Sequence, residues 1–483
     1  MSLNNPASRV RSLLFGKITC PCGREDTHIS LSISLFQAFK RPREDDESHD
    51  AARNFYNTRE EVGVQKRKLS PIYNLKILNN WIKSVLLNQF LELAGQDNQK
   101  LLQKNKLIIS PSSDSDTPSI SIDASCDENG VWHTLATPAV PTPNETIGAG
   151  VSVLDLCGGK GGDLQKFMEH QLRYYVLADI AEKSVDAARI RYNSLLEKPG
   201  RSKKMFPAQF FAGNLCEHRL HHYLHPSLSF DVVSCQFAFH YCFKSEEDAR
   251  RMIENVTDRL RPGGYFVGTL PDARVLVSKL REANAPRFGT GCYNIEFDDP
   301  RGDAAYSDTT RDFWANVDFS ASDPFGIRYT FYLEDAVENV PEYLVHFPTL
   351  CAIAAEYGLR PVLFENFHTF FANRIEDRGP FGGHSLLRTF PMLDDQQSIP
   401  EDQWEATNLY CVFAFQKVGE QWTKRQSPTS SGAQAACVRD IPQDCMTAQV
   451  VHSADPREAG CAWNHTVVQR PRRIEEKEII IPR

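Results

Sequence analysis

The chain contains 483 residues, of which 41% are hydrophobic and 24% charged, and its formal net charge at pH 7 is −8. This composition is typical of a globular protein, and the negative charge excludes a protein whose whole surface coats nucleic acid, while leaving room for a local basic groove. No apolar run approaches the roughly 20 residues of a membrane span, and no charged-then-apolar leader opens the chain, so we expect a soluble protein that is not secreted and has no membrane partner.

The 13 cysteines are scattered without paired Cys-x-x-Cys spacing. In a chain of this type such scatter favours reduced thiols in an intracellular compartment, and we predict no metal site. The length predicts two or three domains, or a single one if long linkers separate its parts.

Residues 1–50 carry little periodicity and end in the basic tetrad Lys40-Arg-Pro-Arg43 followed by an acidic run. We interpret them as a flexible leader. The tetrad is either a solvated charge run, which is the favoured interpretation, or a nuclear import signal.

Residues 51–94 are predicted to be an N-terminal helical part. Between Pro71 and Ala94 apolar side chains recur at three- and four-residue steps, which predicts one amphipathic helix with an apolar face. Asn79, Asn80 and Lys83 fall elsewhere on that helix, where they are available to a ligand, although solvent exposure is the usual fate of such residues.

Residues 95–150 shift in composition to Ser, Thr, Pro, Asp and Asn with few large apolar side chains. We predict a long linker or insertion here and no packed structure. The helix at 71–94 must then fold back onto the domain that begins at Val151.

The stretch from Val151 to Asp163 reads as strand, glycine loop and helix, because a β-branched run breaks into four glycines within five residues. Glycines let the backbone turn sharply and let a ligand approach the main chain, and the following helix presents free N–H groups. The dinucleotide fingerprint G-x-G-x-x-G fails, because its third glycine would fall on Leu164. Acidic residues at Asp155 and Asp179 suit S-adenosylmethionine better, since a carboxylate can accept hydrogen bonds from both ribose hydroxyls. An unliganded strand–helix turn is the alternative.

Strands and helices alternate after Val151, which predicts an α/β fold with a parallel sheet. We expect strands at 151–156, 174–179, 208–212, 230–235 and 265–269, and helices at 162–172, 182–196 and 245–260. Ser245 and Asp248 fit a capping box, and Arg261-Pro-Gly-Gly264 should end that last helix. Ligands in open α/β sheets lie beyond the carboxyl ends of the strands. The polar residues there should converge on one crevice: Asp155, the glycine loop, Asp179, Asn214 and Gln236 to Tyr241.

The C-terminal half adds strand-like alternation at Phe288–Phe297 and Phe325–Phe331, with a polar insertion near 298–324 between them. We expect an antiparallel extension that carries Glu342 toward the crevice. A helix at Phe347–Tyr357 and strands near 361–366 and 409–416 should complete the sheet. The α/β core would therefore span 151–419, and residues 420–483, polar and without periodicity, are interpreted as a disordered tail.

Six motifs then carry a specific resemblance: Asn79-Asn-Trp-Ile-Lys83, Val153-Leu-Asp-Leu-x-x-Gly-Lys-Gly-Gly-Asp163, Ser234-Cys-Gln-Phe-x-x-His-Tyr241, Leu260-x-Pro-Gly-Gly-Tyr-Phe266, Val340-Pro-Glu-Tyr-Leu344 and Tyr410-x-Val-Phe-Ala-Phe415. In this order they resemble the motifs of the eukaryotic mRNA cap guanine-N7 methyltransferases. The resemblance covers about residues 54–94 and 150–417. It implies a Rossmann-like class I methyltransferase fold with a mainly parallel central sheet, an N-terminal helix packed on it and an antiparallel extension.

The resemblance also implies residue roles. Positions that match contacts to S-adenosylmethionine are Lys83, Cys157, Gly159, Asp179, Asn214, Gln236 and Tyr241. Positions that match contacts to the cap are Asn79, Asn80, Lys160, Lys166, Arg191, His240, Glu342 and Tyr410. Lysines and an arginine suit the cap triphosphate, and tyrosines offer flat faces or hydroxyls to a base. Glu342 can accept hydrogen bonds from the N1 and N2 edge of guanine, which separates guanine from adenine.

The chemistry explains why no catalytic triad is expected. The N7 lone pair of guanine is exposed and carries no proton, so direct displacement at the sulfonium methyl needs no general base. Catalysis should come from alignment and from a field that tolerates a cationic product. We therefore assign His240, Tyr241 and Glu342 to positioning, with a packed core histidine as the alternative for His240.

Two departures from the family pattern bear on activity. The family has Gly-Cys-Gly where this chain has Cys157-Gly158-Gly159. If the first position needs a positive φ, a side chain there costs on the order of 1–3 kcal/mol, unless Gly158 lets the loop re-route. The second is Asn214, which stands where the family usually has an acid near the adenine and hydrogen-bonds more weakly than a carboxylate.

The expected function is transfer of a methyl group from S-adenosylmethionine to N7 of the 5′ GpppN cap of nascent mRNA, in the nucleus. Other capping enzymes or an activating subunit are the protein partners that the resemblance leaves open. A capped-RNA-binding pseudo-enzyme is one alternative. A small-molecule methyltransferase is another, but it would leave Lys160, Lys166 and Arg191 without a reason.

Overall fold

The computed structural model describes residues 48–59, 68–105, 122–126, 132–136, 150–170, 172–198, 204–299, 312–317, 319, 323–391 and 399–419. The predicted disordered tail, nearly all of the predicted leader with its basic tetrad, and much of the insertion near 298–324 lie outside these residues.

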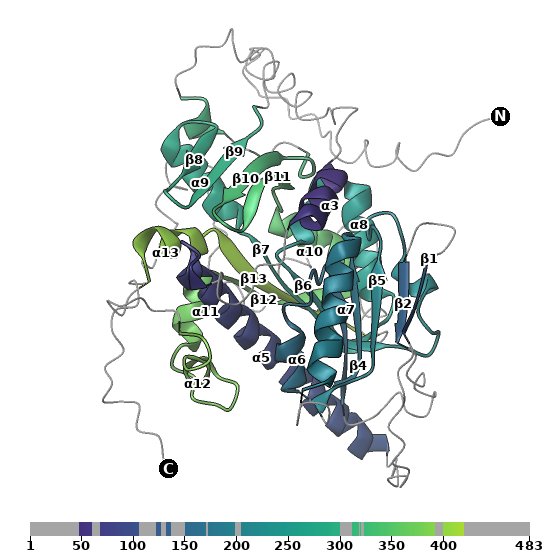
Figure 1. Cartoon of the computed structure of the whole chain (residues 1–483). Helices are drawn as coiled ribbons and strands as arrows, with labels where there is room; N and C mark the ends of the chain where they lie inside the picture. The colour runs from purple at the N-terminus through teal and green to yellow at the C-terminus, as the bar shows by residue number, and fades with distance from the viewer. Residues whose placement is uncertain are drawn as a thin grey trace, which may run out of the picture.

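A nine-stranded sheet forms the centre of the described fold, in the order β1-β2-β5-β4-β3-β6-β7-β13-β12 (Figure 1). Its middle five strands pair in parallel, whereas β13 is antiparallel to both of its neighbours. The strands that follow the predictions are β3 (Val151–Leu156), β4 (Leu172–Asp179), β5 (Ala208–Ala212), β6 (Phe230–Gln236), β7 (Leu260–Pro271), β12 (Leu359–Asn366) and β13 (Tyr410–Lys417). The predicted α/β fold with a mainly parallel sheet is confirmed.

Alternation along the central strands divides the core into two layers. Val153 and Tyr175 pack into one hydrophobic cluster, whereas their chain neighbours Leu154 and Tyr174 pack into the other on the opposite face. Every residue of β3 is buried. Successive side chains of a strand point to opposite faces, so a strand covered on both sides must be apolar throughout, as this one nearly is.

Helices cover both faces. One face carries α5 (Tyr73–Asn105), α6 (Leu164–Met168) and α7 (Glu182–Leu196), which lie in front of the sheet in Figure 1. The other carries α8 (Glu246–Thr257) and α10 (Phe347–Glu356). Ser245 caps α8, because its side chain accepts a hydrogen bond from the backbone N–H of Asp248. The hydrogen bond that the serine contributes to the predicted capping box is therefore formed.

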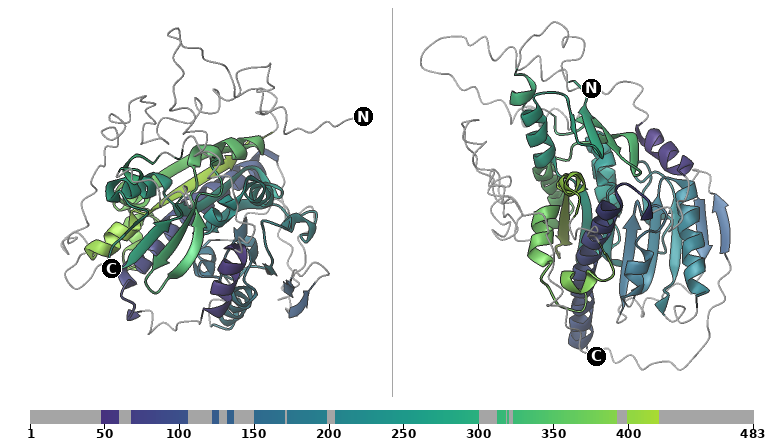
Figure 2. Two further views of the ribbon diagram at one scale, coloured as in Figure 1. Left: turned by 90° about the horizontal axis from the view of Figure 1, so that it is seen from above. Right: turned by 60° about the vertical axis from the view of Figure 1, so that its left-hand side comes forward.

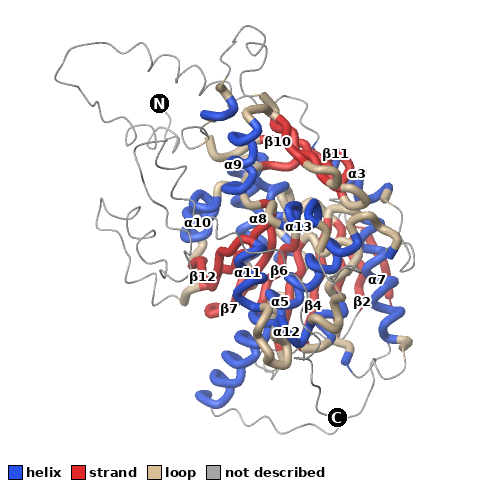
Figure 3. Tube along the Cα trace, turned by 90° about the vertical axis from the view of Figure 1, so that its left-hand side faces the viewer, coloured by secondary structure: helices blue, strands red, loops and turns tan. Residues whose placement is uncertain are grey.

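A separate four-stranded antiparallel sheet in the order β11-β10-β9-β8 confirms the predicted extension. It comprises β8 (Arg287–Gly289), β9 (Tyr293–Phe297), β10 (Arg328–Leu333) and β11 (Val337–Tyr343), and follows α9 (Ala273–Ala283). Figure 3 places β10 and β11 beside the N-terminal helix α3 (Ser48–Thr58) at one end of the central sheet. Figure 2 shows α3 at that end, apart from α5.

The prediction for 51–150 was wrong in three respects. The helix α5 does not end near 94 but runs to Asn105, and it is not amphipathic, since Trp81 and Leu87 on its other sides are also fully buried. The reason is that α11 (Phe367–Arg374), α12 (Gly383–Leu386) and α13 (Glu401–Thr407), none of them predicted, cover the side of α5 that faces away from the sheet. In addition, β1 (Ile122–Cys126) and β2 (Trp132–Ala136) extend the sheet edge next to β5, within the segment expected to carry no packed structure.

Boundaries shifted elsewhere by a few residues. The helix α6 ends at Met168 rather than at 172. The helix α8 ends at Thr257, and Arg261-Pro-Gly-Gly264 belongs to β7 instead of forming the end of the helix. The leader was placed up to residue 50, but α3 begins at Ser48.

Candidate active site

The glycine loop after β3 contains backbone that only some residues tolerate. Cys157 has φ +56°, and Gly159 and Gly161 have φ +52° and +65°. A residue with a Cβ in the left-handed region costs about 1–2 kcal/mol, so Cys157 is strained at the position where the family has glycine. The positive φ on which the predicted cost of a side chain at this position depends is therefore present at Cys157.

Gly158 does not relieve that strain by re-routing the loop, because it does not adopt a positive φ. Its own requirement is space: a Cβ there would lie 2.7 Å from the Leu177 side chain and 2.8 Å from Asp155 Oδ2. A Cβ on Gly159, in contrast, would meet nothing within 4 Å. The main chain at Gly159 therefore faces open space, which suits the close approach of a nucleoside ligand.

The carboxylate of Asp179 at the end of β4 holds this loop. It accepts a hydrogen bond from the backbone N–H of Gly159 at 2.8 Å and another from Ala181 at 2.9 Å. An ionised carboxylate offers about four lone-pair sites, so two remain for ribose hydroxyls. Asp155, the second acid of the pattern, is instead a buried support beneath the loop, where Tyr175 donates a hydrogen bond to it at 2.7 Å. Burial raises the pKa of Asp155 to about 7.

A buried ion cluster beside the loop contains Lys83, a predicted cofactor contact, and Lys166, a predicted cap contact. Asp163 lies 2.9 Å from the ammonium of Lys83 and 2.6 Å from that of Lys166. Burial alone would raise the pKa of Asp163, but the two lysines outweigh it and hold that pKa well below the usual range. Sequence reasoning gave Asp163 no role, yet it anchors both cations.

The residues predicted to bind the cap triphosphate lie in or next to the glycine loop and on α7. Lys166 also donates to Asn80 Oδ1 at 3.1 Å, and Lys160 donates to the carbonyl of Arg59 at 2.7 Å. Arg191 lies one turn beyond Ala188 on α7, and Ala188 is the residue that packs against Gly161. Asn79 Oδ1 is buried without a hydrogen-bond partner among the described residues.

Glu342 on β11 is only 3% exposed. Tyr329, directly across from it in the register of β10 and β11, donates to Oε2 at 2.9 Å, and Tyr241 donates to Oε1 at 3.5 Å. His240 Nε2 approaches Oε1 to 3.3 Å without hydrogen-bond alignment, so within the described part of the chain both ring nitrogens of this buried histidine lack a partner. Buried polar atoms are normally paired, and such orphans indicate a place for a ligand.

Aromatic rings and an amide side chain pack at the end of β6. The ring of Tyr410 lies 5.0 Å from that of Phe237, and Phe237 has φ +56° at the end of β6. Gln236 donates to Ser234 Oγ and accepts from Thr269 Oγ1, each at 3.2 Å. These contacts fix the turn that carries His240 and Tyr241.

Asn214 hydrogen-bonds within its own turn and also lines a small pocket with Ala178 and Gly213. Its Oδ1 accepts from the backbone N–H of Cys216 at 3.0 Å, and its Nδ2 donates to Glu217 at 2.8 Å and lies 3.4 Å from His49 Nδ1. One of the two lone pairs of the Asn214 Oδ1 atom is therefore already engaged within this turn.

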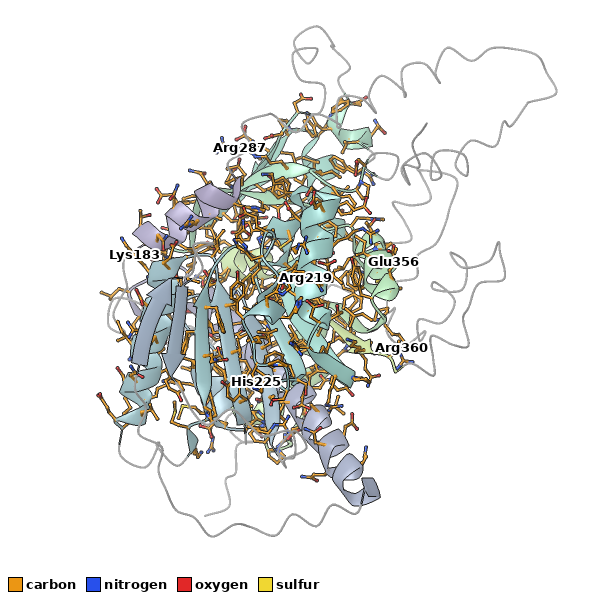
Figure 4. The ribbon with its side chains drawn as sticks, turned by 90° about the vertical axis from the view of Figure 1, so that its right-hand side faces the viewer. Lys183, Arg219, His225, Arg287, Glu356 and Arg360 are labelled. Atoms are coloured by element: carbon orange, nitrogen blue, oxygen red, sulfur yellow. The ribbon has the colours of Figure 1, made fainter. Side chains whose placement is uncertain are left out.

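The helix α3 supplies a residue that sequence reasoning missed. Tyr56 places its hydroxyl 3.3 Å from that of Tyr241, and burial raises its pKa to about 12. Glu182 holds the helix by ion pairing with Arg53 and by accepting from Asn57 at 2.7 Å. Asn57 in turn accepts from the backbone N–H of Lys183, which Figure 4 labels below α3. The run Asn54-Phe-Tyr-Asn57 lay inside the resemblance, but no periodicity or spacing distinguished Tyr56.

Two absences apply to the described residues alone. Their side chains form no group of three or more histidine, cysteine or acidic residues arranged to hold a metal ion. Likewise, none of their helices combines the length and the apolarity that crossing a membrane demands.

Comparison with known proteins agrees with this geometry. The sequence profile of the mRNA (guanine-N(7))-methyltransferase domain matches residues 39–105 and 137–418. The mRNA cap guanine-N(7) methyltransferase 1 of Oryza sativa subsp. japonica is 35% identical over 376 residues, which cover 77% of this chain and 82% of the relative. The protein of the same name from Arabidopsis thaliana is 34% identical over 397 residues, covering 80% and 86%. The mRNA cap guanine-N(7) methyltransferase of Drosophila melanogaster is 31% identical over 407 residues, covering 77% and 78%. Six ordered motifs, the sheet topology and these matches agree: the chain belongs to the mRNA cap guanine-N7 methyltransferase family.

Proposed function

We propose that this protein transfers the methyl group of S-adenosylmethionine to N7 of the 5′ guanosine of GpppN-capped mRNA. The observation that carries the proposal is the buried Glu342 carboxylate beside His240, whose ring nitrogens lack a partner among the described residues, together with Asp179 and the open main chain at Gly159. A site built this way accepts a base on one wall and a nucleoside on the other.

Guanine recognition falls to Glu342. Burial raises the pKa values of Tyr241 and Tyr329 well above the usual range, so both phenols stay protonated and donate to this carboxylate. Their hydrogen bonds orient its oxygens toward the donors on the N1 and N2 edge of guanine, while adenine offers no donor at N1. A site built to bond such groups rejects a base that lacks them.

Asp179, Gly159 and Lys83 would hold the methyl donor, which supplies a sulfonium-bound methyl group. Asp179 has acceptor sites for the ribose hydroxyls, and Lys83, which Asp163 holds beside the loop, offers a cation for the amino-acid carboxylate. Lys160, Lys166 and Arg191 would contact the triphosphate.

No group of the chain has to remove a proton, because N7 carries none. The residues act by aligning N7 with the methyl carbon and by surrounding the purine with a buried carboxylate and phenol oxygens. The negative charge of Glu342 favours the positive charge that develops on the purine. His240 orients guanine in this scheme.

We further propose that residues 51–94 and 151–419 together form the catalytic unit and that the protein works on nascent transcripts in the nucleus, alongside other capping enzymes or an activating subunit. The competing proposal is a capped-RNA-binding pseudo-enzyme. Strained Cys157 and locally engaged Asn214 favour it, since both weaken the cofactor side alone.

The test is incubation with labelled S-adenosylmethionine and GpppG- or GpppA-capped RNA, followed by digestion and detection of 7-methylguanosine. We expect product that disappears in Glu342→Ala and in Asp179→Ala. Capped RNA that binds without turnover would favour the pseudo-enzyme, and loss of both binding and turnover in the unaltered protein would refute the proposal.

A further inference from the structure

Four cysteines meet at the carboxyl edge of the central sheet. Cys157 follows β3, Cys216 lies in the turn after β5, Cys235 lies in β6, and Cys242 lies in the 3₁₀ segment η4 (Phe239–Lys244). The Sγ atoms of Cys216 and Cys242 are hydrogen-bonded at 3.2 Å, and Cys235 is the neighbouring thiol that most affects the pKa of Cys157. The proposed methyl transfer uses none of these four sulfur atoms.

The first pair is chemically unequal. When Cys216 loses its proton it accepts from the Cys242 thiol and from His49, and these bonds lower its pKa to about 7 although burial opposes them. The pKa values of Cys242 and Cys157 are raised well above the usual range, with a neighbouring thiol as the largest cause in each case. A thiolate is the nucleophile in thiol oxidation, so Cys216 is the attacking sulfur and Cys242 the resolving one.

Position supports the same order of attack. His49, at the first turn of α3, lies 3.4 Å from the amide of Asn214 in the Cys216 turn and 3.8 Å from Asp248. Cys216 is 9% exposed and Cys242 3% exposed. A small oxidant therefore reaches Cys216 first.

We propose that Cys216 and Cys242 form a dithiol that hydrogen peroxide oxidises to a reversible disulfide. The Cys216 thiolate attacks one peroxide oxygen, the O–O bond breaks, and the departing hydroxide takes a proton to leave as water, so that Cys216 carries a sulfenic acid. Cys242 sulfur then attacks Cys216 sulfur, the S–O bond breaks, and the hydroxyl leaves with the Cys242 proton as a second water. Two thiols and one peroxide yield one disulfide and two waters, and a dithiol reductant restores the thiols.

The disulfide would tie two loops of the site together. A disulfide bond is about 2.0 Å long, so the sulfur atoms must approach by about 1 Å. Cys242 adjoins Tyr241, and the Cys216 turn includes Asn214, whose amide lies 3.4 Å from His49. A misplacement of this size in a site that works by alignment can lower turnover by about 100-fold. The disulfide itself does not depend on the proposed function, whereas this effect on turnover rests on it.

The experiment exposes the full-length protein to hydrogen peroxide, blocks the remaining thiols with an alkylating reagent and identifies linked peptides by mass spectrometry. We expect a Cys216–Cys242 link that dithiothreitol removes, and no such link in Cys216→Ser or Cys242→Ser. Cys351→Ser is the matched control, because Cys351 is 7% exposed and lies on α10, and it should link normally. His49→Gln should slow link formation at least threefold, since it removes the group that favours the thiolate. A Cys157–Cys235 link in its place, or the absence of any link, would overturn the proposal.

Methyl transfer by the same samples provides the second measurement. Peroxide should lower the turnover of the unaltered protein and of Cys351→Ser by tenfold or more, and dithiothreitol should restore it. Cys216→Ser should keep its activity under peroxide. If Cys216→Ser loses activity as fast as the unaltered protein, then oxidation elsewhere is responsible and the regulatory effect is refuted. If the reduced protein makes no product although the link forms, the proposed function fails and the dithiol site stands.

Discussion

The replacement of Glu342 by glutamine tests guanine recognition with the smallest change of shape. Glutamine keeps the length and volume of the side chain but exchanges one acceptor oxygen for an amide donor and removes the charge. In this structure Oε2 accepts from Tyr329 at 2.9 Å and Oε1 from Tyr241 at 3.5 Å. One orientation of the amide can keep the Tyr329 bond, but the other oxygen position is then lost to guanine.

The magnitude follows from the hydrogen bond removed. A hydrogen bond to a charged group contributes about 1.5–3 kcal/mol, and each 1.36 kcal/mol is tenfold in rate. We therefore expect kcat/KM for GpppA-capped RNA to fall about 10- to 150-fold. Among the described residues, Glu342 reaches the predicted cofactor contacts only through the 3.5 Å contact with Tyr241, so the dissociation constant of S-adenosylmethionine should change much less than kcat/KM does.

The assay measures kcat/KM from 7-methylguanosine formation, and calorimetry measures cofactor binding. Glu338→Gln is the matched control, since Glu338 is an exposed glutamate on the same strand. A decrease of less than threefold in kcat/KM for Glu342→Gln would refute the assignment of Glu342 to guanine. An equal loss in Glu338→Gln would attribute the effect to overall charge.

Three further predictions concern the cofactor side. Asp163→Asn removes the carboxylate that pairs with both Lys83 and Lys166. It should lower the free energy of unfolding by about 3 kcal/mol and weaken S-adenosylmethionine binding. An unchanged Tm together with unchanged binding would contradict the role of Asp163 as their anchor. Gly158→Ala should lower the free energy of unfolding by about 1–3 kcal/mol, because its Cβ would overlap Leu177 and Asp155. In Gly162→Ala the Cβ meets nothing within 4 Å and φ is not positive, so the loss should be under about 0.5 kcal/mol. Equal losses in urea unfolding would show that the loop shifts to accommodate the Cβ added at position 158. Burial raises the pKa of Asp155 to about 7, so the folded state binds more protons than the unfolded state between about pH 4 and 7, and this carboxyl makes the free energy of unfolding fall as pH rises through that window. The free energy of unfolding of Asp155→Asn, relative to that of the unaltered protein, should therefore rise from pH 4 to pH 7. A difference that stays constant with pH would disprove the pKa shift.

The glycine loop shows how far local sequence reasoning reached. Comparison with the family pattern identified Cys157 as a strained substitution, and its φ of +56° bears that out. The same reasoning misjudged Gly158, because the need for glycine there comes from Leu177 and Asp155, which belong to the neighbouring strand and to the strand before the loop. The residues on either side of Gly158 in the sequence do not predict such a contact with a neighbouring strand.

The prediction of no packed structure in residues 96–150 was wrong for a related reason. A linker composition correctly reflects weak local preference, but the edge of β5 offers unpaired backbone groups that β2 satisfies, and β1 then pairs with β2. Such edge pairing depends on main-chain hydrogen bonds rather than on side-chain hydrophobicity. Composition alone does not predict it.

The sequence by itself determined the strand–loop–helix unit, the alternating α/β order and the set of polar strand ends, because these depend on periodicity and turn chemistry within short segments. Only the tertiary structure decided that Tyr329 faces Glu342, that one aspartate holds Lys83 and Lys166, and that α3 brings Tyr56 to Tyr241. Those pairs join residues 13, 80 and 185 positions apart in the chain, and Asp163 lies only three positions from Lys166. Their meeting is set by strand register and helix packing, which result from burying apolar surface over the whole domain.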